Sequence, residues 1–327
     1  MKKLIKSALA AFASVACLTQ FAPANAAYPE RPVRLIVPFS AGGPTDTMAR
    51  LVAEYLGSRL GQVITVINKP GADNLIAARE VVGSAADGYT LMFTTNGLLS
   101  IAPTVHPEFP IKPMKQFSFI GGVSSYPYMF VTGVNDKRNT LGDFIGDSRK
   151  NSGSVSYAVV GNVSLVAMAL FKDSLDIDML AVRYKGNSDT ITDLFAERLN
   201  LGTFAPSFAL PLLKANKVKP LAVTGEKRLA QLPDLPLASE IDPALKDFSV
   251  NSVVWTGIVA PVGVPEDIRA RLEQELSRVV ADDKFVAQVE KLGDQVQWRT
   301  GEQLRQRVES ESAVWARVVK NTNLTLK

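Results

Sequence analysis

The segment Pro38-Phe39-Ser40-Ala41-Gly42-Gly43-Pro44-Thr45-Asp46 joins an apolar, β-branched run to an amphipathic pattern. The run before it, Val33–Val37, predicts a strand, and apolar residues at spacings of three and four after it predict a helix over Asp46–Leu60. The two glycines let the backbone approach a ligand closely. The start of the helix adds free N–H donors and a partial positive charge. We therefore expect this loop to hold an anion, such as a carboxylate, through backbone groups.

Strands and helices alternate along the rest of the chain. This alternation indicates mainly parallel sheets covered by helices, with ligands at the carboxyl ends of the strands. The predicted strands are Val33–Val37, Val63–Ile67, Tyr89–Phe93, Met129–Val131, Val155–Val159, Leu180–Arg183 and Leu221–Val223. The predicted helices are Asp46–Leu60, Asn74–Ser84, Leu141–Arg149, Leu165–Lys172, Asp189–Arg198, Glu266–Asp282 and Gly301–Lys320.

The length of 327 residues exceeds the usual size of a single core, so two domains are expected. A second set of elements starts near Tyr128, and the chain returns through Val250–Val259. We therefore assign residues 27–127 and 250–327 to lobe one and residues 128–249 to lobe two. The fold class is α/β, with two domains that each contain a sheet flanked by helices. Two crossings between the lobes imply a ligand cleft and a hinge.

The first 26 residues have the pattern of a secretory signal peptide. Three lysines at positions 2, 3 and 6 precede an apolar stretch, and Ala24-Asn25-Ala26 offers a small-residue cleavage site. We expect export to the periplasm, with residues 1–26 removed. An alternative is a lipoprotein in which Cys17, the only cysteine, carries the lipid, although Ser14 is a poor residue at its position for that motif.

Charge and composition exclude several classes of function. Of the 36 basic residues, three lie in the leader, which leaves 33 against 32 acidic residues. There is no basic stripe interleaved with aromatics, so we expect no nucleic-acid binding. His106 is the only histidine, and its neighbours Pro103 and Pro107 indicate a surface turn. It cannot by itself form a metal site or a catalytic triad. No nucleophile elbow, Gly-x-Gly-x-x-Gly or Walker motif occurs, so we predict no catalytic residue, cofactor or metal.

Ordered motifs along the chain resemble the Bug-type solute-binding proteins, which are periplasmic receptors of tripartite tricarboxylate transporters. The motifs are Tyr28–Pro32, Pro38–Asp46 with Ala49-Arg50, Asn68–Ala72, Asp87–Leu91, Thr95–Gly97, Tyr184–Gly186, Leu221–Thr224 and Leu232–Pro236. The resemblance implies a type II-like binding-protein fold. It also implies a monomer that holds a small carboxylate between the Gly-Gly loop and the loop around Tyr184–Asn187. The membrane subunits of the transporter would be its partners.

The loop chemistry and the resemblance together predict the ligand contacts. In lobe one they are Phe39, Ser40, Ala41, Gly42, Gly43, Asp46, Thr95 and Asn96. In lobe two they are Asn162, Ser164, Tyr184, Gly186, Asn187, Ser188 and Phe204. Several of these have structural alternatives. Gly42-Gly43 is alternatively a tight strand-to-helix connection, Thr95-Asn96 a simple turn, and Ser164 the cap of a helix that starts at Leu165. Asp46 is either an ordinary first-turn carboxylate or a residue that shapes the loop, and Phe204 is either a core residue or a stacking surface.

The sequence departs from the family pattern at several positions. Asp73-Asn74-Leu75 stands where a Gly-Gly-Asn run is frequent, and Val163 stands where a glycine is frequent. Ala167 stands where a histidine is frequent, and Phe204 where a polar or acidic residue is frequent. These changes predict a more apolar distal half of the pocket. An aromatic or otherwise less polar carboxylate is then expected. Two other functions stay open from sequence: a ligand-presenting sensor module for a membrane kinase, and an exported α/β enzyme acting on a carboxylate.

Overall fold

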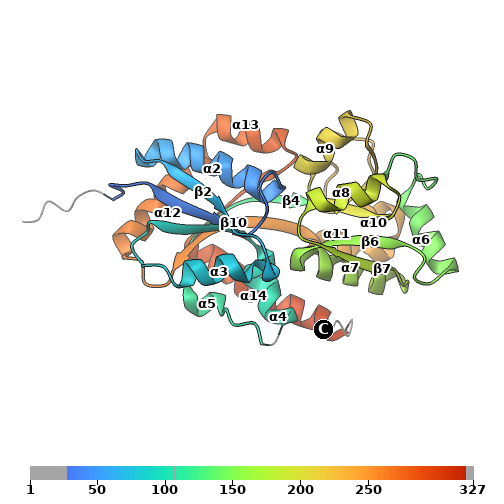
Figure 1. Ribbon diagram of the computed structural model, residues 1–327, viewed down its shortest axis with the longest axis horizontal. Coiled ribbons are helices and arrows are strands. Elements are labelled where there is room, and N and C mark those ends of the chain that lie inside the picture. The colour runs from blue at the N-terminus through green and yellow to red at the C-terminus, as the bar shows by residue number, and fades with distance from the viewer. Residues whose placement is uncertain (1–27, 107, 322–327) are drawn as a thin grey trace, which may run out of the picture.

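The structure is a computed structural model that describes residues 28–106 and 108–321. The leader, its cleavage site and Cys17 lie outside the described residues. The molecule is elongated, with two lobes side by side along its long axis (Figure 1). Among the described residues, no helix is both long enough and apolar enough to cross a membrane.

Lobe one is built on a six-stranded sheet with the order β11-β4-β10-β3-β1-β2. Its strands are β1 (Val33–Val37), β2 (Ile64–Asn68), β3 (Thr90–Thr95), β4 (Phe117–Pro127), β10 (Val253–Pro261) and β11 (Gln295–Thr300). β1 pairs in parallel with β2 and β3, whereas β10, β4 and β11 continue the sheet in antiparallel fashion. The expectation of a mainly parallel sheet was therefore wrong for half of this sheet, because β4 and β11 were not predicted.

Two hydrophobic cores lie on the two faces of this sheet. Side chains alternate along a strand, so Val33, Leu35 and Val37 join one core while Ile36 joins the other. The first core includes apolar residues of α2 (Pro44–Leu60), α12 (Glu266–Val280) and α13 (Asp283–Lys291). The second includes residues of α3 (Leu75–Val82), α4 (Ala102–Val105) and α14 (Gly301–Asn321). The remaining helical segments are η2 (Ala72–Asn74), the π-helix η3 (Gly97–Ile101) and α5 (Pro113–Gln116).

Lobe two contains shorter strands. They are β5 (Met129–Gly133), β6 (Ser156–Val160), β7 (Leu180–Tyr184), β8 (Gly202–Phe204) and β9 (Val218–Val223). β8-β5-β9 form one sheet and β6-β7 another. Backbone bonds from Ala158 N to Leu201 O, 2.9 Å, and from Leu201 N to Ser156 O, 3.0 Å, join the two sheets. The helices are α6 (Leu141–Lys150), α7 (Gly161–Leu175), α8 (Asn187–Phe195), α9 (Pro206–Lys214), α10 (Ala238–Ile241), η4 (Pro243–Leu245) and α11 (Lys246–Asn251).

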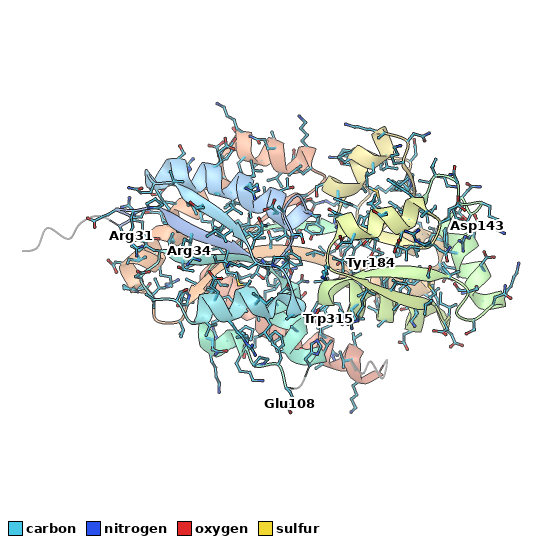
Figure 2. The ribbon with its side chains drawn as sticks, viewed as in Figure 1. Arg31, Arg34, Glu108, Asp143, Tyr184 and Trp315 are labelled. Carbon is cyan, nitrogen blue, oxygen red and sulfur yellow. The ribbon has the colours of Figure 1, made fainter. Side chains whose placement is uncertain are left out.

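The C-terminal helix α14 connects the lobes on the side of α4. It starts after β11 in lobe one, and Trp315 near its other end joins a core that contains Ile101 and Val105 of lobe one and Val166 of lobe two. Trp315 lies below the junction in Figure 2. The two lobes are thus in contact through a packed apolar cluster as well as through the two chain crossings.

Candidate functional site

A cavity lies between the lobes, at the carboxyl ends of β1, β3, β6 and β7. Lobe one and the crossings contribute Phe39, Ser40, Ala41, Gly43, Pro44, Thr45, Asn74, Thr95, Gly97, Tyr126, Tyr128 and Val254. Lobe two contributes Val160, Gly161, Asn162, Val163, Ser164, Gly186, Asn187, Ser188, Thr203 and Ala205. The cavity has a volume of about 70 Å³. A space this narrow is suited to a small molecule held from both sides.

Three helix N-termini meet at this cavity. α2 starts after Gly43, α7 after Val160 and α8 after Gly186, and all three residues line the cavity. Within the described chain, none of these N-cap residues provides a side-chain hydrogen bond to its helix. Each start therefore leaves backbone N–H groups free and adds a partial positive charge, which favours an anion.

The lining has no formal charge of its own. Among residues 28–106 and 108–321, no Asp, Glu, Lys, Arg or His side chain lines this cavity. In the same residues, no group of three or more His, Cys, Asp or Glu side chains is placed to hold a metal ion. An anion in the cavity would be held by helix starts and neutral polar groups.

Asp46 fixes the shape of the Gly-Gly loop from behind. Its carboxylate is only 2% exposed and accepts hydrogen bonds from Gly42 N at 2.8 Å, Arg50 Nε at 2.9 Å and Asn68 Nδ2 at 2.8 Å. Burial alone would raise the pKa of Asp46, but these three donors hold the pKa below its usual value of 3.8. Asp46 does not line the cavity, so its position agrees with a role in shaping the loop.

The turn of this loop is at Gly42, whereas Gly43 has an ordinary backbone. Gly42 has φ +80°, a conformation that favours glycine, whereas Gly43 has φ −80° and ψ 170°. Gly42 lies just outside the cavity lining and Gly43 lies within it. The two glycines therefore do different things: Gly42 makes the turn, and Gly43 keeps the space next to the helix start free of a side chain.

Thr95 ends β3 and Asn96 follows it, but the two side chains face different ways. Thr95 lines the cavity, and its Oγ1 accepts a hydrogen bond from Gly97 N at 3.2 Å. Asn96 points away: its Nδ2 donates to Val253 O at 3.2 Å and to Glu311 Oε1 at 3.4 Å. Glu311 on α14 also accepts from Ser100 Oγ and Trp255 Nε1. Asn96 is thus a scaffold residue that anchors the π-helix behind the cavity.

In lobe two, the first turn of α7 provides the polar lining. Ser164 Oγ accepts from Val160 N at 2.7 Å and donates back to Val160 O, which holds the start of the helix in shape. Asn162 is 1% exposed, and neither atom of its amide group has a hydrogen-bond partner in the described part of the chain. Thr203 Oγ1 is buried without a partner among the same residues. The amide of Asn162 and the hydroxyl of Thr203 are therefore available to form hydrogen bonds with a ligand.

The structure brings most of the predicted contacts together. Those that line the cavity are Phe39, Ser40, Ala41, Gly43, Thr95, Asn162, Ser164, Gly186, Asn187 and Ser188. Those that do not are Gly42, Asp46, Asn96, Tyr184 and Phe204. Phe204 packs edge-on against Phe208 in the core of lobe two and is fully buried. Phe204 therefore does not line the cavity, because β8 turns this side chain into the core.

Tyr184 lies beside the cavity and not in its lining. Its hydroxyl donates to Asp193 Oδ2 at 2.8 Å, and burial together with this carboxylate raises the pKa of Tyr184 to about 12. The side chain lines an adjoining hollow with Lys185, Asp73 and Pro70. Figure 2 shows Tyr184 on the lobe-two side of the junction.

Sequence reasoning missed several lining residues. Asn74 is buried in a left-handed conformation, φ 75°, which asparagine adopts more easily than most residues. The departure at Asp73-Asn74-Leu75 was the available signal. Tyr126 and Tyr128 flank Pro127 at the first crossing between the lobes, and residues at such a crossing are natural walls of a cleft.

A buried carboxyl group lies close to this site without lining it. Asp294, between α13 and β11, is 3% exposed, and its Oδ1 has no partner among the described residues. Burial raises the pKa of Asp294 well above its usual value of 3.8. The pKa of Tyr126 is raised first by burial and further by the carboxyl group of Asp294. The preceding Gly293 meets lobe two, since a methyl group there would lie 2.5 Å from Pro206 Cβ.

We expect Asp294→Asn to raise the thermal unfolding temperature at pH 7.5. The folded-state pKa lies above the unfolded value, so wild-type folding takes up a proton and becomes less favourable as pH rises above about 4. The amide of Asp294→Asn does not ionise, so the variant has no cost from a buried charge. Its increase in unfolding temperature over wild type should therefore be smaller at pH 4.5 than at pH 7.5. Scanning calorimetry at both pH values checks this, and an equal or negative change at pH 7.5 contradicts it.

The comparisons with known proteins agree with this architecture. The family model described as the tripartite tricarboxylate transporter family receptor matches residues 48–324, and the chain belongs to that family. A UPF0065 protein from the TAR-I ttuE–ttuC′ intergenic region of Agrobacterium vitis is 32% identical over 287 residues, covering 87% of this chain and 82% of the relative.

Solved structures show the same fold. The periplasmic binding protein BugD has a TM-score of 0.84 and 30% identity, covering 92% of this chain and 100% of the other. MatC from Rhodopseudomonas palustris with bound malate has a TM-score of 0.81 and 30% identity, covering 89% and 100%. The resemblance to Bug-type proteins and the two-domain binding-protein fold are confirmed. The chain is a solute receptor of the tripartite transporter type.

Proposed function

We propose that this receptor captures one small carboxylate in the cavity between its lobes and delivers it to the membrane subunits of a tripartite tricarboxylate-type transporter. The observation that carries the proposal is the meeting of three uncapped helix N-termini, from both lobes, at one narrow cavity. The malate bound by MatC supports a carboxylate as the ligand class. We assign the chain no catalytic role and treat it as a monomer.

Ligand binding should favour the closed arrangement of the lobes. A methyl group on Gly97 would lie 3.0 Å from Val163 Cγ2, and one on Gly186 would lie 3.7 Å from Ser40 Oγ, so the walls nearly touch. A ligand that contacts both walls gains all of its contacts only when the cleft is closed. Its binding energy then shifts the population towards that state.

The proposed closure of two lobes around a ligand also defines how the chain is divided into lobes. Residues 27–127 and 250–327 form lobe one and residues 128–249 form lobe two, in keeping with the strands that build the two sheet systems. Residues 1–26 act as a signal peptide that directs the receptor to the periplasm without lipid on Cys17. The periplasmic location of BugD supports this placement.

The lining favours a carboxylate with a less polar body over a compact tricarboxylate. Val163 lies in the cavity wall, and no charged side chain of the described residues is there to pair with further carboxylates. A second or third ionised group facing neutral walls would lose hydration without full compensation. Ala167 and Phe204 also suggested this preference. Ala167 is buried in the cluster shared by the two lobes and Phe204 in the core of lobe two, so both act on the pocket only through the packing behind it.

A thermal-shift screen of the mature protein tests the function. Benzoate, benzamide and citrate form the first set, because benzoate and benzamide have similar size and differ in charge. We expect benzoate to stabilise the protein, by about 2.7 kcal/mol at 100 times its dissociation constant. Benzamide should have no measurable effect, and citrate should be displaced by benzoate in competition calorimetry.

Two outcomes would count against these claims. Equal stabilisation by benzoate and benzamide would mean that the cavity does not select an anion. Tight citrate binding without any binding of benzoate would reverse the preference for a less polar body, while leaving the carboxylate receptor in place.

A further inference from the structure

The amide of Asn162 is the most unusual polar group in the cavity. It lies in the first turn of α7, is 1% exposed, and its oxygen and nitrogen both lack a partner within the described residues. A buried amide without partners destabilises a protein by about 1–3 kcal/mol, so such groups point to a binding role. Because both atoms are unpartnered, the conclusion holds for either orientation of the amide.

The amide side chain of Asn162 binds different ligand groups from those bound by the helix starts, which hold a carboxylate. The Asn162 nitrogen donates hydrogen bonds, but its oxygen accepts them and needs a donor on the ligand. A carboxylate has only acceptors, so it would leave that oxygen facing another oxygen. A hydroxyl group accepts from the nitrogen and donates to the oxygen, and it satisfies both atoms. Thr203 Oγ1, buried and unpartnered among the described residues, adds a second group that both donates and accepts.

We infer that the ligand carries a neutral hydrogen-bond donor, such as a hydroxyl group, next to Asn162, in addition to the carboxylate held by the helix starts. The inference rests on the proposed function and narrows it to hydroxylated carboxylates. It is supported by the neutral lining of the cavity, since no lysine or arginine of the described chain lines it to pair with a second carboxylate. Asn162 is thus a specificity-determining residue.

Matched pairs of acids test the inference by calorimetry. The pairs are propionate with lactate and benzoate with 4-hydroxybenzoate, which place a hydroxyl group beside the carboxylate or across a ring. We expect the hydroxylated acid to bind at least about tenfold more tightly in at least one pair, since a site with unpaired polar groups discriminates against analogues that lack the partner. Succinate, with a second carboxylate, should bind more weakly than the preferred hydroxylated acid.

The variant Asn162→Leu connects the preference to this residue. It has a similar shape and removes the unpartnered amide, so we expect the hydroxyl preference to fall to about twofold or less while the unligated protein becomes more thermally stable. Asn200→Leu is the control. Its amide oxygen accepts from Ser156 N at 2.9 Å outside the cavity, so this change should lower stability and leave the preference intact.

The outcomes separate the two claims. If carboxylates bind but the hydroxyl group makes no difference in either pair, or if Asn162→Leu leaves the preference unchanged, the inference is wrong and the carboxylate receptor stands. If Asn162→Leu destabilises the unligated protein as Asn200→Leu does, the amide has a structural role and the inference is likewise overturned. If no carboxylate binds at all, both the function and the inference are wrong.

Discussion

Replacement of Gly43 by leucine is expected to weaken carboxylate binding by about a hundredfold or more, equivalent to about 2.7 kcal/mol, while changing the thermal unfolding temperature little. Gly43 lines the cavity at the start of α2, next to the proposed position of the carboxylate. Its φ of −80° and ψ of 170° are open to any residue. A Cβ there would meet only Ser40 O, at 3.5 Å, within the described structure, which is an ordinary contact.

The backbone therefore accepts a side chain at Gly43, and the cavity does not. In a cavity of about 70 Å³, a leucine side chain would occupy the space that the ligand needs. Titration calorimetry with the tightest carboxylate of the screen measures the loss, and circular dichroism checks the fold. Gly146→Leu on α6 is the matched control, because nothing in the described chain lies within 4 Å of a Cβ there and it is outside the cavity.

Unchanged affinity in Gly43→Leu would place the carboxylate elsewhere. Unfolding of the variant would instead show that the loop, not the ligand space, requires glycine at this position. The same substitution at Gly42 would not separate these possibilities, since its φ of +80° makes any side chain strained.

The sequence predicted the elements whose apolar pattern is regular and local. β1 has the predicted bounds, Val33–Val37, and α2 starts two residues before the predicted helix because Pro44 suits the first turn. The strand β4 was missed, since Gly121-Gly122 and Ser124-Ser125 have low strand propensity. A Cβ on Gly121 would lie 2.8 Å from the ring of Trp298, so tertiary packing demands glycine there. Such long-range contacts leave no local pattern.

The same distinction separates the predicted site residues. The polar segments that follow β6 and β7 can be read from sequence, so Asn162, Ser164, Gly186 and Ser188 lie in the lining as predicted. The helix bounds were less accurate, because α7 starts at Gly161 and not at the predicted Leu165. The direction of Asn96 depends on Glu311, which lies 215 residues further along the chain. No spacing argument could show that this amide turns away from the cavity. Direct contact with a ligand remains a prediction for every lining residue.

Asp46 shows how a first-turn carboxylate becomes a structural centre. Sequence left open whether it is an ordinary helix carboxylate or part of the loop design. Its three donors come from the turn itself, from the next turn of α2 and from the end of β2, so one side chain ties three segments together. Asn68 also donates to Phe39 O at 2.9 Å, which extends the network to the cavity wall.

Asp46→Ala is expected to lower the free energy of unfolding by about 2–4 kcal/mol, because it leaves Gly42 N–H and the Asn68 amide without their buried acceptor. The Arg50 side chain is more than half exposed and can hydrogen-bond to water in the variant, so the loss of its ion pair with Asp46 contributes little. Urea unfolding at pH 7 measures the change. Glu266→Ala is the control: it removes another first-turn carboxylate paired with an arginine, but an exposed one, and should change the free energy of unfolding far less than Asp46→Ala does.

The pH dependence of the stability lost on replacing Asp46 shows whether the charge of its carboxylate is the cause. The folded-state pKa of Asp46 lies below the unfolded value of about 3.8, so the carboxylate stabilises the fold fully above about pH 5 and loses that contribution as pH falls through the folded pKa. The gap between wild type and Asp46→Asn should therefore narrow from pH 6 to pH 3. A gap that stays constant would assign the effect to shape alone. Carboxylate affinity at pH 7 should fall in both variants, because the turn that presents Gly43 to the ligand is held by this one ionised group.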